Sequence, residues 1–262
     1  MTTIDFITQL FCRVDDAMPN AKKHSQANLY PSEVVTLAIL FALKGVGNRA
    51  FYRWLERDYK ELFPNLPDRT RLFRLFNTHR HWTKVFMADH SLIGIVDSYG
   101  IELIHPRREG RSDQQIGKKG LSNQRWIVGG KLCYVINHLG LIVDWDADTA
   151  NVYDGTAFQD LVDRNADYMA LFSDEGFEKK DWHPENLKIC KAGEWNSRMI
   201  VETVLSMLTL VNHFKKVMHR KWAYFKSRLA FTMAMFNILV EWDGIQVDEL
   251  GCVHFSLAPF SL

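Results

Sequence analysis

The N-terminal third of the chain repeats apolar residues at helical spacing and interrupts the repeat at short polar turns. Residues 32–45 begin with Ser32, continue as an apolar run and stop at Gly45, which is typical of one helix with its start and stop signals. Residues 48–63 and 67–86 carry apolar side chains every three or four positions. The pattern predicts a helical bundle. Such bundles often bind DNA, but any small helical domain shows the same pattern.

Short apolar runs replace the helical pattern in the middle of the chain. Residues 92–97 end in Asp97, and after a Ser-Tyr-Gly turn a second run follows at residues 101–105, which predicts a hairpin. Residues 126–137 and 141–150 predict a second pair of strands.

Helices and strands then alternate. An amphipathic helix is expected at residues 154–165, a strand at 168–173, a shorter strand at 187–190 and a long helix at 196–220. Together with the earlier strands, this order predicts an α/β (α+β) fold with a mixed sheet flanked by helices.

The longest apolar run, from Leu229 to Trp242, is interrupted by polar residues and is too short to span a bilayer. It predicts a buried helix. The apolar residues of the tail from Asp243 to Leu262 show no regular spacing. We therefore divide the chain into a helical N-terminal domain (1–90), a catalytic or binding domain (91–240) and a C-terminal tail (241–262), and we expect no membrane partner.

Composition excludes several classes of protein. Hydrophobic residues make up 47% and aromatic residues 13% of the 262 residues, which excludes a disordered chain. The N-terminus has no basic segment leading into an apolar run, so no secretory signal is expected. Cys12, Cys133, Cys190 and Cys252 are far apart and form no metal or disulfide motif, which favours reduced thiols and a cytoplasmic location.

The formal net charge of the chain at pH 7 is +1, but two segments are locally basic. Residues 203–240 contain no acid and include Lys215 and Lys216. The cations between residues 107 and 131 are Arg107, Arg108, Arg111, Lys118, Lys119, Arg125 and Lys131. These segments predict either a polyanion bound at a defined place or two solvated faces, and both interpretations stay open here.

Three acids could meet in the predicted fold. Asp97 ends the first strand, Asp174 follows the strand at 168–173, and Glu202 lies on the long helix. Parallel neighbouring strands would bring both aspartates to one edge of the sheet, where α/β folds usually place their chemistry. Oxygen ligands suit Mg²⁺ or Mn²⁺, and two such ions can clamp the attacking and leaving oxygens of a phosphoryl transfer. The alternative for Glu202 is a plain ion pair with Arg198.

Motifs for other chemistries are missing. Alternating acids at residues 144–148 suggest a calcium loop, but Thr149 and Gly155 stand where the loop needs glycine and glutamate. The sequence holds no zinc-protease motif, no glycine-rich phosphate loop and no serine nucleophile elbow. No small-molecule substrate is expected.

Five segments then follow one another along the chain. They are IVDSYG around Asp97, WIVGGKLCYVINHLGLI from Trp126, ADTANVYDG to Asp154, LFSDEGF around Asp174 and RMIVETVLSML from Arg198. In this order they resemble the catalytic domain of bacterial insertion-sequence transposases with a DDE triad, which belong to the RNase H-like superfamily. The resemblance covers roughly residues 91–240, and the helical N-terminal part also looks like one branch of these transposases.

The resemblance implies roles for individual residues. Asp97, Asp174 and Glu202 would be the catalytic metal ligands for Mg²⁺ or Mn²⁺, with two ions. Arg198, four residues before the glutamate, would contact the DNA backbone. Lys215 and Lys216 would take the place of a basic residue of the family, because Thr209 stands at its usual position.

The sequence differs from the pattern of the resembling family at two further positions near the expected triad. Trp195 stands where many relatives have a tyrosine, and Cys133 where a histidine is common. The further DNA contacts expected from the basic segment are Arg107, Arg108, Lys118, Lys119 and Lys131.

The resemblance thus implies an RNase H-like DDE transposase that cuts double-stranded DNA at element ends and joins them to target DNA. A homodimer in the bacterial cytoplasm, associated with the nucleoid, is expected. The alternatives are an inactive or domesticated DNA-binding relative, and a nuclease of the same fold without strand transfer.

Overall fold

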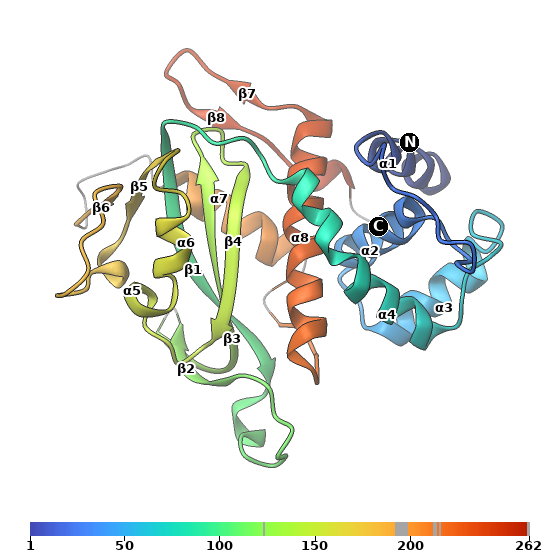
Figure 1. Ribbon diagram of the computed structural model, residues 1–262, viewed down its shortest axis with the longest axis horizontal. Coiled ribbons are helices and arrows are strands. Elements are labelled where there is room, and N and C mark those ends of the chain that lie inside the picture. Colours follow the sequence, from blue (N-terminus) through green and yellow to red (C-terminus); the bar gives the residue numbers. More distant parts are fainter. Residues whose placement is uncertain (123, 192–198, 212–213, 215, 261–262) are drawn as a thin grey trace.

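A computed structural model describes residues 1–122, 124–191, 199–211, 214 and 216–260. The chain has a mixed α/β fold in which a group of helices lies beside a curled mixed sheet, with one long helix between them (Figure 1). The N-terminal helices are α1 (Thr3–Asp16), α2 (Pro31–Lys44), α3 (Asn48–Asp58) and α4 (Arg69–His79), followed by a 3₁₀ helix (Arg80–Phe86). The predicted helical bundle is confirmed.

The start of α2 differs from the prediction. Ser32 does not cap the helix, because it lies inside the first turn and is buried. The helix begins at Pro31, whose fixed φ suits the first helical position. The Glu33 carboxylate accepts a hydrogen bond from the Tyr30 N–H (2.6 Å), and Gly45 ends the helix in the left-handed region, with φ 67°.

The main sheet combines antiparallel and parallel pairing. Its strands are β1 (Ile93–Ile104), β2 (Lys118–Ser122), β3 (Arg125–Asn137), β4 (Ile142–Thr149), β5 (Ala170–Ser173) and β6 (Leu187–Ile189). The order is β2-β3-β1-β5-β6, and β4 also pairs with β3. The contacts of β3 with β1, β2 and β4 are antiparallel, whereas β5 runs parallel to both β1 and β6.

The hairpin predicted after Asp97 is wrong. Residues 98–100 continue β1, because β3 pairs with them residue by residue, from Ser98 opposite Cys133 to Gly100 opposite Lys131. Asp97 therefore lies in the middle of a long strand. The strand β2 was not predicted, since its sequence, KKGLS, has almost no apolar residues.

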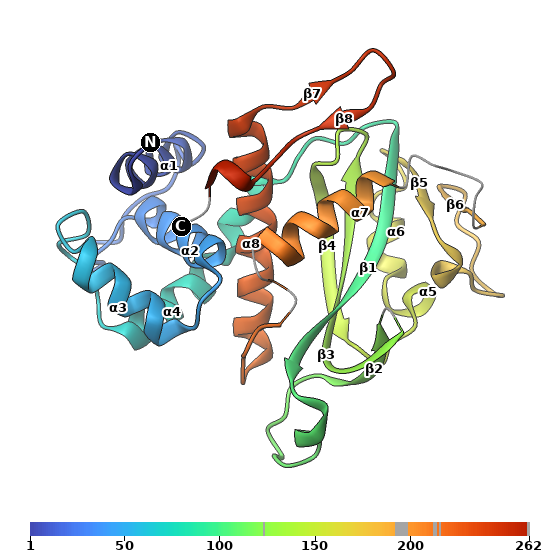
Figure 2. The same cartoon turned by 180° about the vertical axis from the view of Figure 1, so that it is seen from behind.

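Helices cover both faces of the sheet. Figure 1 shows α5 (Asp154–Ala157) and α6 (Gln159–Asp163) on the front face, and Figure 2 shows α7 (Met199–Ser206) on the opposite face. The amphipathic segment predicted as one helix is thus two short ones, with Phe158 between them.

The prediction of one long helix up to residue 220 is also wrong in its second half, because α7 ends at Ser206. A π-helical turn (Met207–Val211) follows α7, and Lys216 forms a bridge with Glu102 of β1 instead of continuing the helix. Pairing with the sheet edge replaces helical hydrogen bonds there, since the Val217 N–H donates to the Glu102 carbonyl.

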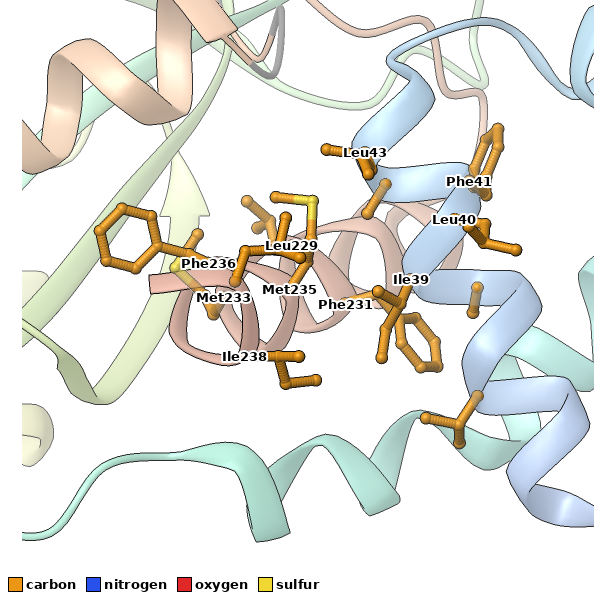
Figure 3. Packing of buried hydrophobic residues seen from close by; sticks show 14 of the residues in the cluster. Ile39, Leu40, Phe41, Leu43, Leu229, Phe231, Met233, Met235, Phe236 and Ile238 are labelled. Carbon is orange, nitrogen blue, oxygen red and sulfur yellow. The ribbon is translucent and has the colours of Figure 1, made fainter. Parts of the chain in front are cut away.

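The helix α8 (Trp222–Asp243) is the predicted buried helix, and it packs between α2 and the sheet. Its side chains from Phe225 to Val240 are almost all buried, with Phe231 toward α2 and Phe236 on the other side (Figure 3). One continuous core joins the N-terminal helices, α8 and one face of the sheet, and a second core lies under α5 and α6. The boundary expected near residue 90 therefore separates elements that share a core, and the domain division stays a prediction.

The tail has more order than its sequence pattern indicates. A small hairpin, β7 (Gln246–Val247) with β8 (Val253–His254), leads into a 3₁₀ turn (Ala258–Phe260). The Phe260 ring lies 5.8 Å from Phe6 and 5.2 Å from Trp242, which ties the tail to α1. Among the described residues no single helix is both long and apolar enough to span a membrane; α2 and α3 together reach that length and composition but are bent by 117°.

A buried amide fixes α8 to the sheet. The Asn237 side chain accepts a hydrogen bond from the Ile142 N–H (2.8 Å) and donates to the Ile142 carbonyl (2.7 Å) and the Phe86 carbonyl (2.9 Å). Asn237 is 1% exposed, so water cannot replace these bonds. The amide thus completes the hydrogen bonding of the first residue of β4 from the side of the helix.

We expect Asn237→Ala to lower the free energy of unfolding by about 3 kcal/mol, since the Ile142 N–H and the Phe86 carbonyl would lose this partner inside the core, whereas the Ile142 carbonyl keeps the Ala88 N–H. Urea denaturation measures the change. Asn237→Leu restores the side-chain volume but not the hydrogen bonds, and it should be destabilised to a similar extent. A leucine variant as stable as the wild type would show that packing, not hydrogen bonding, is what matters here.

Candidate active site

The parallel pairing of β1 and β5 ends just before two of the predicted acids. The last paired residues are Ile95 and Phe172. Asp97 and Asp174 each stand two residues further along, where β5 has ended and β1 continues. The two strands are therefore parallel neighbours as expected, and β5 does not cover the edge of β1 beyond Ile95.

A pocket of about 600 Å³ lies at this open edge. Asp97 and Asp174 line it from the sheet, and Glu202 lines it from α7. The structure therefore brings the three acids singled out in the sequence to one pocket, although they come from segments far apart along the chain.

Each aspartate is held by a neighbouring backbone group. The Asp97 Oδ1 atom accepts a hydrogen bond from the Ser98 N–H (2.8 Å). The Asp174 Oδ1 atom accepts one from the Gly176 N–H (2.9 Å) and so caps the 3₁₀ turn Glu175–Phe177. Asp174 thus turns the chain and lines the pocket as well. Its neighbour Glu175 is exposed and does not line the pocket.

The helix α7 presents Glu202 by packing its apolar side onto the sheet. Val201, Val204 and Leu208 are buried in the core between α7 and β1. Glu202 and Ser206, one turn apart, line the pocket on the other side of the helix. Two of the predicted DNA contacts, Arg198 and Lys215, lie outside the described residues.

Asp154 is a fourth acid at the pocket, which the predicted triad does not include. Its Oδ1 atom accepts a hydrogen bond from the Lys131 ammonium (2.8 Å), and its Oδ2 atom accepts one from the Ser98 hydroxyl (2.8 Å). The Lys131 ammonium also donates to the Val152 carbonyl (2.9 Å). Asp154 stands at the end of a segment that carries the family resemblance. The sequence does not reveal its partners, because the three residues come from β1, β3 and α5.

The two faces of the sheet contribute different groups to the site. Asp97 faces the side covered by α7, since its neighbours in the pleat, Ile95 and Ile101, belong to that core. Ser98 and Lys131 face the side covered by α5 and α6, as do Val96 and Cys133. Because β5 no longer covers this edge, both sets of side chains reach the same pocket.

Two titratable side chains of β3 lie directly behind the acids. Tyr134 pairs with Asp97 across the ladder, and Cys133 pairs with Ser98. Burial raises the pKa of the Cys133 thiol and of the Tyr134 hydroxyl well above their ordinary values, and the Asp97 charge raises each pKa further. Cys133, which stands where the resembling family often has a histidine, belongs to the core under α5 and α6 and does not line the pocket.

The other predicted DNA contacts are spread around the sheet. Arg107 and Arg108 are exposed on a 3₁₀ turn (Pro106–Arg108) in a segment that projects beyond the sheet (Figure 1). Lys118 and Lys119 are exposed on β2, and Lys216 forms an ion pair with Glu102. Among the predicted DNA contacts that the structure describes, Lys131 is the one that lines the pocket.

The donor set of the pocket is suited to hard divalent ions. Carboxylate oxygens are the ligands that Mg²⁺ and Mn²⁺ prefer, and Mg²⁺ usually keeps several waters while binding one or two carboxylates. Within the described ranges no three acids, histidines or cysteines are grouped closely enough to hold one ion together. An ion at one or two of these carboxylates would keep waters as its other ligands.

Comparisons of the chain with protein-family models, with curated proteins and with solved structures find no match. The sequence pattern and the geometry of the pocket are therefore the basis on which a function can be assigned.

Thiol reactivity tests the position of β3 behind the acids. Because the thiolate is the reactive form, burial should protect Cys133 and Cys190 from alkylation, whereas the exposed Cys12 and Cys252 should react quickly at about pH 8. Mass spectrometry after a short exposure to iodoacetamide identifies the labelled residues. Denatured protein, in which all four thiols should react, is the control. Labelling of native Cys133 as fast as Cys12 would contradict the buried position.

Proposed function

We propose that the protein is a DDE transposase with an RNase H-like catalytic unit, which cuts DNA at the ends of an insertion sequence and joins them to a target. One observation carries the proposal. Asp97, Asp174 and Glu202, which the resemblance selects from the sequence alone, line the same pocket. An antiparallel group, β4-β3-β1, that continues into the parallel strands β5 and β6 is in keeping with the RNase H-like arrangement.

Under this proposal the three carboxylates hold two Mg²⁺ ions, for which Mn²⁺ can substitute. When bound, the ions activate the attacking oxygen and stabilise the leaving oxygen of an in-line phosphoryl transfer. Asp174 is oriented for this role by the Gly176 N–H, and Glu202 by the packing of α7. Lys131 supplies a positive charge in a pocket whose other charged lining residues, among those described, are acids, and so offsets their repulsion of a phosphate.

The proposed partner is double-stranded DNA, as element ends and as target. The exposed cations Arg107, Arg108, Lys118 and Lys119 surround the sheet and support contacts to phosphates. Lys216 serves the same role in this proposal, together with its ion pair to Glu102. A homodimer is proposed because a transposase has to hold two element ends. The proposed location is the bacterial cytoplasm. The N-terminal helices are proposed to read the element ends.

The first test of this function replaces the acids one at a time. Asp97→Asn, Asp174→Asn and Glu202→Gln should each reduce Mg²⁺-dependent cleavage of a duplex with an element end by at least about a hundredfold, because each removes charge that positions an ion. Gel-based cleavage assays measure the rate, and binding to the same duplex should persist.

Glu175→Gln is the matched control. It removes a carboxylate next to Asp174 that does not line the pocket, so its cleavage rate should stay within about threefold of the wild type. Full activity of any triad variant would exclude that residue from the site. Binding of element ends without cleavage by the wild type would favour an inactive relative, and cleavage without joining would favour a nuclease.

The second test concerns the projecting segment. Arg107→Ala together with Arg108→Ala should reduce the slope of log K against log salt by about 0.9 for each phosphate that the protein no longer neutralises. Arg107→Lys with Arg108→Lys keeps both charges and should keep the slope. Fluorescence anisotropy over a range of salt concentrations measures both variants. An unchanged slope in the alanine variant would mean that this segment is a solvated face and does not bind DNA.

A further inference from the structure

The Lys131–Asp154 pair is largely shielded from solvent at the wall of the pocket, unlike the surface ion pairs of this protein. Both side chains are 13% exposed. Both Asp154 oxygens are engaged, one by the Lys131 ammonium and the other by the Ser98 hydroxyl. A partly buried pair with complete hydrogen bonding holds its members in one geometry, which a flexible surface pair does not.

The pair lies next to the acids proposed to hold metal. A Cβ atom placed on Gly176 would lie 2.9 Å from Asp174 Oδ1 and 3.4 Å from Asp154 Oδ2. The two carboxylates therefore face the same small space. An ammonium released from Asp154 would find Asp174 as the next carboxylate along the wall of the pocket.

A lysine in such a pocket can either assist or oppose the binding of divalent ions. Bound to Asp154 at one side of the pocket, the Lys131 ammonium does not pair with the remaining carboxylates and can present its charge to a phosphate. Released, it pairs with those carboxylates, because they are the remaining acids that line the pocket among the described residues. It would then compete with the ions for the same oxygens.

We propose that Asp154 is a positioning residue that holds the Lys131 ammonium away from Asp97 and Asp174, so that this lysine does not compete with divalent ions there. Ser98 takes part by fixing the second oxygen of Asp154, so that the first faces the lysine. The inference rests on the proposed function, since it assumes that divalent ions bind at the acids. It adds a fourth carboxylate, which acts through the lysine and not as a ligand.

Metal binding to the full chain without DNA tests the role of Asp154. The melting temperature is followed while Mn²⁺ is titrated, for the wild type, Asp154→Asn, Lys131→Gln and the double variant. In Asp154→Asn the freed lysine should raise the Mn²⁺ concentration for half-maximal stabilisation by about tenfold. The double variant has no lysine to compete, and it should return to the wild-type concentration or below.

A purely structural ion pair gives a different result. It predicts a lower melting temperature in both single variants, with no change in the Mn²⁺ midpoint, and this outcome would overturn the inference. A double variant that binds Mn²⁺ as weakly as Asp154→Asn would identify Asp154 as a ligand and would also overturn it. Ser98→Ala provides a milder change should Asp154→Asn fail to fold, and it should shift the midpoint in the same direction by about threefold.

The wild-type measurements separate this inference from the proposed function. Metal binding and DNA cleavage by the wild type, with an unchanged midpoint in Asp154→Asn, would overturn the inference alone. A wild type that is not stabilised by Mn²⁺ and does not cleave DNA would overturn the metal site, and the inference with it.

Discussion

The contact of Asn237 with Ile142 is the constraint on which the arrangement of this protein depends. The helix α8 is buried on nearly every side, and apolar packing alone would allow it to slide or rotate against its neighbours. Its amide bonds both backbone groups at the start of β4 and also reaches the end of the 3₁₀ helix before the sheet. One side chain thus sets where the N-terminal helices, α8 and the sheet meet, and a shift of any one of them leaves buried polar groups without partners.

The pocket is a consequence of unequal strand lengths. The strand β5 has four residues whereas β1 has twelve, so β1 continues past the point where its parallel neighbour stops. Backbone that would otherwise be covered becomes an open edge, and polar side chains from both faces can gather there without being buried in a core. The acids cost little stability at this edge because they stay in contact with solvent.

Much of the fold was predictable because it follows from local patterns. The apolar runs before Asp97 and Asp174 predict buried strands, and the run from Leu229 predicts a buried helix; each is present. The predictions failed where tertiary pairing decides. Ser98, Tyr99 and Gly100 look like a turn, yet β3 pairs with them and keeps them extended. Lys216 continues a helical pattern, yet its segment pairs with Glu102.

The site shows the same division. The three acids of the proposed triad could be chosen from the sequence because they end apolar runs or lie on an amphipathic helix. Asp154 could not, because its partners, Ser98 and Lys131, lie 56 and 23 residues away. Only the register of β1 against β3, with α5 packed beside them, brings these three side chains together.

The pleat of β1 has a consequence for how such a site can change over time. Asp97 and Ser98 are consecutive residues on opposite faces of one strand. The position of the Asp97 carboxylate therefore fixes the position of Ser98, whose hydroxyl bonds Asp154. A single inserted or deleted residue before them would exchange the two faces and move both side chains out of their present positions at once. A change of length before Asp97 would therefore disrupt the pocket, whereas beyond Ser98 the strand already accommodates a register shift between Glu102 and Ile104.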